Sequence, residues 1–521
     1  MCAQHTQDAQ PCACLDGLKD PLDAGVRLRR LALLQLLAEG ELTPGIQASE
    51  YAQRRERLCR ALPPGSVVVL QAANPQYMAG IIPYPYRQDP DFFYLTGINQ
   101  IAVAVIQTDP SPQGGTQHRY TLFVEPPNSE KARWEGERLD LEAAKTVFGA
   151  HEAYYTTQLR RRLLDALIHA PLVLHPTSSL AHSKDVAWAL SEALLAPSGP
   201  SPTTPSPPSP ASTSPAPAPE KGMGGGHSAD APPSAVAGAA GRQPISAVPL
   251  TAALHAMRVR KSAAEVRLMR ASADASAQAL RKCMAMTRPG VWERSLGVTF
   301  EYECKMKGAS RLSFPPIVAS GVDACTIHYL RMDKVLREGS LVLMDAGCEL
   351  HGYCSDVTRT WPVNGRFSPP QRDVYEAVLD THARCIEACK PGTSSIRSLH
   401  QLSVRLTCEA LKDLRLVPQG ISIEAVEARH LNTFYWHSVG HLLGLDTHDS
   451  ASMGFDKPLQ PGQCLTIEPG LYIPDHEPHF GALRGVGVRI EDDVVVTEQG
   501  CEVLSAAAPV AIGELEEQLR K

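Results

Sequence analysis

The stretch that decides the fold reads "MDAGCELHGYCSDVTRT", residues 344–360. It continues the apolar run "SLVLMDAG" and leads into "SDVTRTWPV", and both runs are typical of β-strands. Asp345 and Asp356 lie inside these runs, although aspartate is uncommon in strand interiors. The segment "CELHGYC" between them has the length of a hairpin turn and includes Gly352.

The register of this hairpin decides how close the two aspartates come. If Leu350 and His351 form a two-residue loop, Asp345 lies opposite Asp356 on one face of the sheet, with Cβ atoms about 5 Å apart. A shift of one residue would separate them. Two like charges at this distance destabilise a hairpin unless one carboxyl is protonated or a cation lies between them. The sequence therefore predicts either a carboxylate dyad or a cation site.

The composition restricts the class of protein. The chain has 521 residues, a net charge of −6 and 14 cysteines. The charge gives no basic footprint for nucleic acid, and no apolar run reaches the ~18 residues of a membrane span. Without a secretory segment, we expect reduced thiols in an intracellular compartment. Cys348 and Cys354 would be half of a zinc site, but no second Cys/His pair has the spacing that a structural zinc site requires.

Composition also divides the chain. Alternating strand-like and helix-like runs predict an α/β domain over 41–196, and residues 197–243 are a Pro/Ser/Ala/Gly-rich insert, expected to be disordered. A long helical stretch then opens an α+β domain over 244–510, followed by a C-terminal tail, 511–521. Residues 1–40 are an N-terminal extension and a candidate targeting segment. Its "GVRLRRLALLQLL" resembles a transit-peptide helix, but aspartates precede it.

Further ionisable residues stand in apolar or glycine-rich runs downstream. His441 lies in "HSVGHLLGLDTHD", Glu468 in "TIEPGLYIP", and Arg489 and Glu491 are expected on one face of the strand "GVGVRIEDDVVV". Each alone has an ordinary structural explanation. Together with Asp345 and Asp356, these side chains supply the four carboxylates and one imidazole that suit a pair of divalent ions, and an oxygen-rich set favours Mn²⁺.

These motifs resemble the aminopeptidase P branch of the metallopeptidases with the creatinase, or pita-bread, fold. The matching segments are "IHY" (327–329), "MDAGCELHGYCSDVTRTWPVNGRF" (344–367), "HSVGHLLGLDTHD" (437–449), "TIEPGLYIP" (466–474), "GVRIEDDVVVTEQG" (487–500), "YAQRRERL" (51–58) and "YPYRQDPDFFYLTG" (84–97). "GELTPGI" (40–46) is most similar to the organellar subgroup of intermediate-cleaving peptidases and mitochondrial Xaa-Pro aminopeptidases. One departure is Gly80, where relatives often carry an aspartate.

The resemblance implies a site. Its metal ligands would be Asp345, Asp356, His441, Glu468 and Glu491, holding two divalent ions. Asp356 and Glu491 would contact both ions. Water activated by the ions would attack the first peptide carbonyl while Glu468 takes its proton.

The resemblance also implies roles for residues around the ions. His328 and His448 would donate hydrogen bonds to the carbonyl oxygen, and Arg489 would hold the Glu491 strand. His437 would face the leaving residue, and Trp134 would reach the site of a neighbouring subunit.

The resemblance implies an aminopeptidase that removes one N-terminal residue. Its substrates would be the N-termini of presequence-processed organellar proteins, which implies a mitochondrial location; otherwise the location is cytoplasmic. We expect no nucleic-acid partner, no membrane span, and a homodimer or homotetramer. Two alternatives stay open: an Xaa-Pro aminopeptidase acting on proline-containing peptides, and, in a different class, a catalytically dead peptide-binding module of the same fold.

Overall fold

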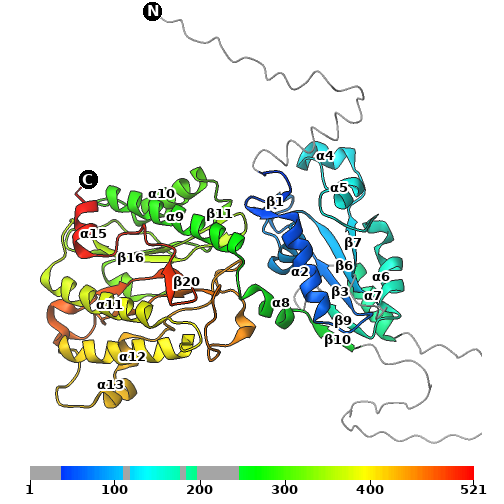
Figure 1. Cartoon of the computed structure of the whole chain (residues 1–521). Helices are drawn as coiled ribbons and strands as arrows, with labels where there is room; N and C mark the ends of the chain where they lie inside the picture. Colours follow the sequence, from blue (N-terminus) through cyan, green and yellow to red (C-terminus); the bar gives the residue numbers. More distant parts are fainter. Residues whose placement is uncertain (1–36, 110–117, 176–183, 196–245, 521) are drawn as a thin grey trace, which may run out of the picture.

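The computed structural model describes residues 37–109, 118–175, 184–195 and 246–520, which form two bodies joined through helix α8 (Figure 1). The expected N-terminal extension 1–40 lies outside these residues except for 37–40, and the Pro-rich insert 197–243 lies outside them altogether. Among the described helices, none combines the length and the apolar content that a bilayer span requires.

The N-terminal body is built on a six-stranded mixed sheet. Its strand β3 (Val67–Gln71) is buried along its whole length, as its run of β-branched residues predicts. In spatial order the strands are β10 (Ser246–Pro249), β9 (Leu172–His175), β3, β6 (Ala102–Thr108), β7 (His118–Val124) and β8 (Glu152–Tyr155). The surrounding elements are β1 (Glu41–Thr43), β2 (Ile46–Gln47), α2 (Ala48–Arg60), β4 (Tyr77–Ala79), β5 (Ile82–Pro83), α3 (Pro90–Thr96), α4 (Ser129–Glu135), α5 (Leu141–Thr146), α6 (Leu159–Leu167) and α7 (Lys184–Leu195).

Strand β10 follows the Pro-rich insert and pairs in parallel with β9. The second domain was expected to start at 244, whereas the chain first returns to the N-terminal sheet and leaves it after Pro249. The run "SAVP" gives no strand signal because it is short and contains a proline. The proline is tolerated because β10 is an edge strand.

The long helical stretch after β10 divides into α8 (Thr251–Arg258) and α9 (Ala263–Met286). Ser262 starts α9 through a capping box. Its hydroxyl accepts a hydrogen bond from the Glu265 backbone N–H (3.2 Å), and the Glu265 carboxylate accepts one from the Ser262 N–H (2.8 Å). Helix α8 is therefore a separate helix through which the chain passes from one body to the other.

The C-terminal body has four small antiparallel sheets. They contain β11 (Arg311–Leu312), β14 (Cys348–Leu350) and β15 (Tyr353–Cys354); β12 (Ile317–Ser320), β13 (Leu341–Ala346) and β16 (Val357–Pro362); β17 (Cys464–Ile467), β20 (Asp492–Val496) and β21 (Cys501–Val503); and β18 (Gly470–Tyr472) with β19 (Gly487–Arg489). The further helices are α10 (Glu293–Met306), α11 (Pro369–Ala388), α12 (Ile396–Asp413), α13 (Ile423–Arg429), α14 (Leu431–Phe434) and α15 (Ile512–Gln518).

Helices cover these strands on two sides. Figure 1 shows α9 and α10 on one side of β16 and β20, and α11 and α12 on the other. One apolar cluster spans the layers and includes Phe300 of α10, Trp361 of β16 and Tyr375 of α11. Helix α15 adds the fully buried Leu515 to this cluster, so the expected C-terminal tail packs into the core of the domain.

Candidate metal centre

The first hairpin places two carboxylates on one face, in a register different from the expected one. Leu350 pairs with Tyr353, so the two-residue loop is His351–Gly352, with φ of 52° and 90°. The expected Leu350–His351 loop is wrong, because a two-residue turn with positive φ at both positions favours glycine at the second. Asp345 consequently pairs with Thr358.

The correction shifts the hairpin by two residues and keeps both aspartates on one side. Ala346 pairs with Val357 on one side of a short break and Glu349 pairs with Cys354 on the other, so Gly347 stands opposite Asp356. Side chains alternate with a period of two, which leaves Asp345 and Asp356 diagonal neighbours on one face. A Cβ on Gly347 would lie 1.7 Å from the Ser355 carbonyl oxygen, so only glycine permits this approach.

A second hairpin brings Glu468 and Glu491 together. Ile467 pairs with Asp492 and Gly470 pairs with Arg489, and counting inward from either pair places Glu468 opposite Glu491. We expected Arg489 and Glu491 in one strand, which is wrong: β19 ends at Arg489, β20 begins at Asp492, and the two belong to different sheets. Glu491 lies in the two-residue break between β19 and β20.

Thr358 joins the two hairpins at this break. Its carbonyl accepts a hydrogen bond from the Glu491 backbone N–H (3.1 Å), and its hydroxyl donates to Glu491 Oε2 (2.6 Å). Thr358 was not among the residues expected at the site. Its position two residues after Asp356, on the same side of the strand, was the signal available.

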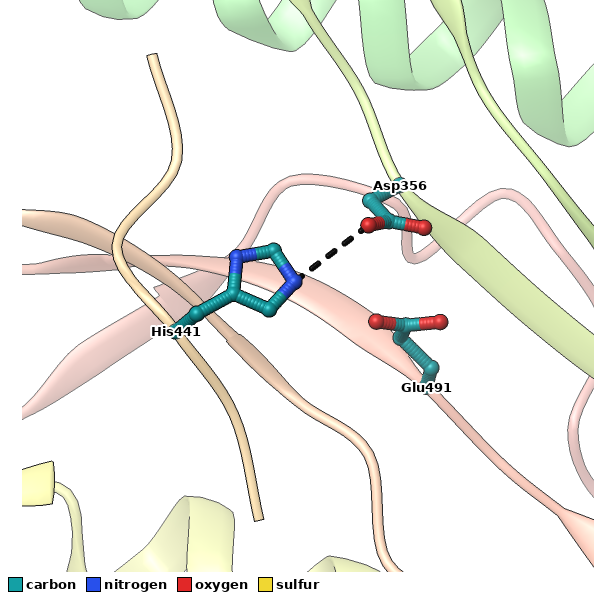
Figure 2. A group of neighbouring side chains, drawn as sticks. All are labelled: Asp356, His441 and Glu491. Atoms are coloured by element: carbon teal, nitrogen blue, oxygen red, sulfur yellow. Dashed lines mark ion pairs between the residues drawn. The ribbon is translucent and has the colours of Figure 1, made fainter. Parts of the chain in front are cut away.

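His441 faces the hairpins from the loop between α14 and β17. Its Nδ1 lies 3.1 Å from the Leu442 carbonyl, which can only accept, so Nδ1 carries the proton and Nε2 keeps its lone pair. Nε2 lies 3.4 Å from Asp356 Oδ2 and 3.8 Å from Glu468 Oε1. Figure 2 shows this nitrogen directed at the Asp356 carboxylate, with Glu491 beside it.

The cluster fits a divalent cation. One ligand atom each of Asp356, His441 and Glu491 lies within 4.8 Å of the others. The Asp345 Oδ1 and Asp356 Oδ1 atoms are buried, and neither has a hydrogen-bond partner among the residues that the structure describes. A buried carboxylate oxygen without a donor is costly, and a bound cation would remove that cost. Carboxylates with one imidazole are typical ligands of hard or borderline divalent ions, not of ions that prefer thiolates.

The electrostatics of the carboxylates lead to the same conclusion. Burial, and then the neighbouring Asp345, raises the pKa of Asp356 well above its ordinary value. Burial and Asp356 likewise raise the pKa of Glu491. Burial raises the pKa of Glu468 to about 7, although His441 and Arg489 oppose the shift. Without a cation these side chains favour protons.

Arg489 and Tyr472 form a hydrogen-bond network next to the carboxylates. Arg489 Nη2 donates to Asp345 Oδ2 (2.6 Å) and Nη1 donates to the Tyr472 hydroxyl (3.0 Å). The same hydroxyl lies 2.9 Å from His437 Nε2, and His437 Nδ1 lies 3.7 Å from Glu468 Oε2. Tyr472 was not identified from the sequence, because a tyrosine in a strand reads as an ordinary core residue.

Of the remaining candidate residues, His448 lies beside the carboxylate cluster and Trp134 lies in the other body. The His448 ring lies 4.1 Å from the His441 ring, centroid to centroid, and burial, then His441 and His328, lowers its pKa. The two predicted histidine donors, His328 and His448, therefore lie near enough to each other to interact electrostatically. Trp134 lies on α4 of the N-terminal body with 86% of its surface exposed, and no contact among the described residues joins it to this site.

Comparisons with known proteins show the family to which the chain belongs. Residues 267–498 match the model of metallopeptidase family M24, and residues 51–174 match that of the aminopeptidase P N-terminal domain. The chain is 36% identical to the mitochondrial intermediate cleaving peptidase 55 of Arabidopsis thaliana, over 92% of this chain and 85% of the relative. It is 33% identical to human Xaa-Pro aminopeptidase 3, over 92% and 88%.

Solved structures show the same similarity in three dimensions. Proline aminopeptidase P II from Yersinia pestis superposes with a TM-score of 0.77 at 31% identity, and the match covers 91% of this chain and 100% of that one. Aminopeptidase PepP of Pseudomonas aeruginosa gives the same TM-score at 32% identity, over 91% and 98%.

Proposed function

We propose that this metalloaminopeptidase trims one residue from the N-termini of presequence-processed organellar proteins. The chain belongs to metallopeptidase family M24 and has an aminopeptidase P N-terminal domain before its pita-bread catalytic domain. The observation that carries the chemistry is the group of Asp356, His441 and Glu491. The similarity to a mitochondrial intermediate cleaving peptidase supports the choice of substrate and a mitochondrial location.

Two divalent ions, held by Asp345, Asp356, His441, Glu468 and Glu491, would lower the pKa of water at the site and polarise the peptide carbonyl. Glu468 then accepts a proton from the attacking water and passes it to the leaving amine. Its pKa of about 7 before a cation binds is a result of burial and becomes lower once positive charge is added.

The histidines and Arg489 orient the reaction. His448 and His328 donate hydrogen bonds to the carbonyl oxygen as negative charge develops there. Arg489 keeps the Asp345 carboxylate in place through its 2.6 Å contact. His437, fixed by Tyr472, forms the wall next to the leaving residue.

A second specificity is favoured by a particular observation. The chain is also 33% identical to human Xaa-Pro aminopeptidase 3 over 92% of its length, so cleavage before proline is the competing proposal. Xaa-Pro peptides and peptides that begin with Tyr, Phe or Leu, compared by kcat/KM with Mn²⁺ added, distinguish the two. Mature N-termini from organelles with the enzyme, without it, and with Glu468→Gln in its place provide the decisive comparison.

The two proposals predict different N-termini. Many organellar proteins carrying one extra bulky residue, both without the enzyme and with Glu468→Gln, support organellar trimming. Unchanged N-termini together with hydrolysis confined to Xaa-Pro peptides support the proline-specific enzyme. Fractionation of the tagged full-length protein tests the mitochondrial location separately.

The assembly is part of the proposal. Trp134 is 86% exposed, and a neighbouring copy in a homodimer or homotetramer would cover it. Light scattering on the wild type and on Trp134→Ala measures this directly. A monomeric wild type would contradict the proposed assembly without affecting the metal site.

A further inference from the structure

Arg258, the last residue of α8, lies between the two bodies with only 3% of its surface exposed. Its Nη1 donates to Asp91 Oδ1 of α3 (2.7 Å), and its Nη2 donates to Asp446 Oδ2 (2.8 Å) and to Asp449 Oδ1. One guanidinium therefore binds a carboxylate of the N-terminal body and two carboxylates of the C-terminal one.

The two C-terminal carboxylates belong to the loop that begins at His441 and passes through His448. Lys261 binds the other oxygen of Asp449 (3.0 Å), and the Asp449 N–H donates to the Leu442 carbonyl (2.9 Å). This packing is close: a Cβ on Gly444 would lie 2.4 Å from Asp449 Oδ2. The end of the loop is thus fixed directly beside His448.

A second arginine ties the same loop to the N-terminal body. Arg87 Nη2 donates to the Leu445 carbonyl (2.7 Å) and to Asp446 Oδ1 (3.0 Å), and its Nε donates to Glu349 Oε2 (2.8 Å). Glu349 lies in the hairpin that carries Asp345 and Asp356. The loop, the metal-bearing hairpin and the N-terminal body therefore share one network of charges.

The His448 ring depends on this network for its position. Within the described part of the chain, no hydrogen bond holds the partly exposed ring, which packs against the His441 ring. A side chain without a direct anchor is positioned by its backbone. Burying the Arg258–Asp449 pair is also costly, and buried ion pairs often stabilise a fold no better than apolar residues do. The arrangement is better explained by geometry than by stability.

We propose that Arg258 and Asp449 are positioning residues that hold the 442–449 loop so that His448 reaches the reacting carbonyl, and that Asp91 makes this position depend on docking of the N-terminal body. The inference rests on the hydrogen-bonding role of His448 in the proposed function. It assigns a catalytic contribution to a contact between domains, made by residues that do not touch the substrate.

A double-mutant cycle between Asp91→Asn and His448→Ala tests the inference. Asp91→Asn removes one charge from the network without altering the loop sequence. We expect kcat on any cleaved peptide to fall about 5- to 50-fold with little change in KM, the range of coupling within one network. In the His448→Ala background the same change should alter kcat less than about 2-fold, because the group it positions is gone.

Glu50→Gln is the matched control. The Glu50 carboxylate also joins the two bodies, because it accepts a hydrogen bond from the Ser262 hydroxyl (2.7 Å) while it binds Arg54 of its own helix (2.7 Å). No hydrogen bond among the described residues joins Glu50 to the loop. We expect kcat within about 2-fold of the wild type. Metal content and thermal midpoints are measured for every variant. Arg258→Lys, which keeps the charge but loses the forked geometry, should lower kcat as Asp91→Asn does.

The outcomes separate this inference from the proposed function. The positioning role is wrong, and the role of His448 stands, in either of two cases. In the first, His448→Ala lowers kcat and Asp91→Asn lowers kcat by the same factor with or without His448. In the second, Glu50→Gln lowers kcat as much as Asp91→Asn does. Loss of metal in Asp91→Asn would also overturn it. If His448→Ala leaves kcat unchanged, the proposed role of His448 fails, and the inference fails with it.

Discussion

The sheet of the N-terminal body and the strands of the C-terminal body use β-structure in opposite ways. Strands β3, β6 and β7 run for five, seven and seven residues without a break, and most of their side chains are buried. In the C-terminal body each of two hairpins is interrupted, at Gly347–Asp356 and at Glu468–Glu491, and the register resumes unchanged beyond the break.

The difference shows how a sheet can hold charges. A continuous ladder satisfies its own backbone groups by pairing them with the neighbouring strand. A break of one or two residues frees the backbone, as when the Glu491 N–H turns to the Thr358 carbonyl, while the flanking pairs keep the acids aligned. Continuous strands therefore serve as the scaffold, and the interrupted ones carry the site.

Removing the metal should affect only the interrupted strands. We expect a chelator to abolish hydrolysis, since the buried carboxylates lose the charge that balances them. Added Mn²⁺ should restore activity, with two ions per chain by metal analysis. In hydrogen exchange, amides of β16 and β20 should exchange faster after chelation, whereas β3 and β6 should not. Full activity in chelator, or equal loss of protection in β3, would contradict the comparison.

Gly347→Ala should break the first hairpin. The added Cβ would lie 1.7 Å from the Ser355 carbonyl oxygen, so the strands must separate. We expect a loss of about 3 kcal/mol in the free energy of unfolding, with loss of bound metal. Gly500→Ala is the control, because a Cβ there meets nothing within 4 Å, and it should shift stability by less than about 0.5 kcal/mol. A stable, metal-loaded Gly347→Ala would show that the close approach is dispensable.

Asp449→Asn should cost stability in a pH-dependent way. Burial raises the pKa of Asp449, but Lys261 and Arg258 outweigh burial and hold it below its usual value. A depressed folded pKa contributes stability that is complete above the unfolded value near 4 and is lost as pH falls through the folded value. The variant should be less stable by about 3 kcal/mol at neutral pH, and the difference should shrink below about pH 4.

Thermal midpoints of both proteins from acid to neutral pH measure this difference. Asp456→Asn, which loses an exposed pair with Arg397, should leave the midpoint unchanged at every pH. A difference for Asp449→Asn that stayed constant down to the most acidic condition would exclude the charge as its cause.

Deleting Ser198 through Ala240 should have the smallest effect. The segment has almost no large apolar residues, and shortening a loop changes closure entropy by less than about 1 kcal/mol. We expect kcat/KM within about 2-fold of the wild type and a nearly unchanged thermal midpoint. A large loss of either would mean that the insert contributes to the fold or to the site.

The sequence predicted the carboxylates better than their arrangement. Asp345 and Glu468 are visible because each interrupts an apolar run. The hairpin register depended on His351, which adopts a positive φ of 52°, uncommon for a residue other than glycine. The break before Glu491 was hidden because "RIEDDVVV" continues a strand pattern, and only pairing with distant partners ends the strand.

The contacts between the two bodies could not be predicted at all. Arg258 reads as an ordinary basic residue of an amphipathic helix. Its partners Asp91 and Asp449 lie 167 and 191 positions away in the chain, so no local spacing relates them. Strand β10 was missed for a similar reason, because its four residues form a strand only where β9 offers an edge.

The pairing of β10 with β9 also determines what the chain would do if it were cut. A break between Leu195 and Ser246 would leave a first fragment in which β9 pairs only with β3 and has one open edge, and a second fragment that begins with the missing edge strand. An exposed sheet edge accepts an added strand through main-chain hydrogen bonds. The two fragments would therefore be complementary halves that recognise one another, and this segment is the natural place to divide the enzyme into a split reporter whose activity returns on reassembly.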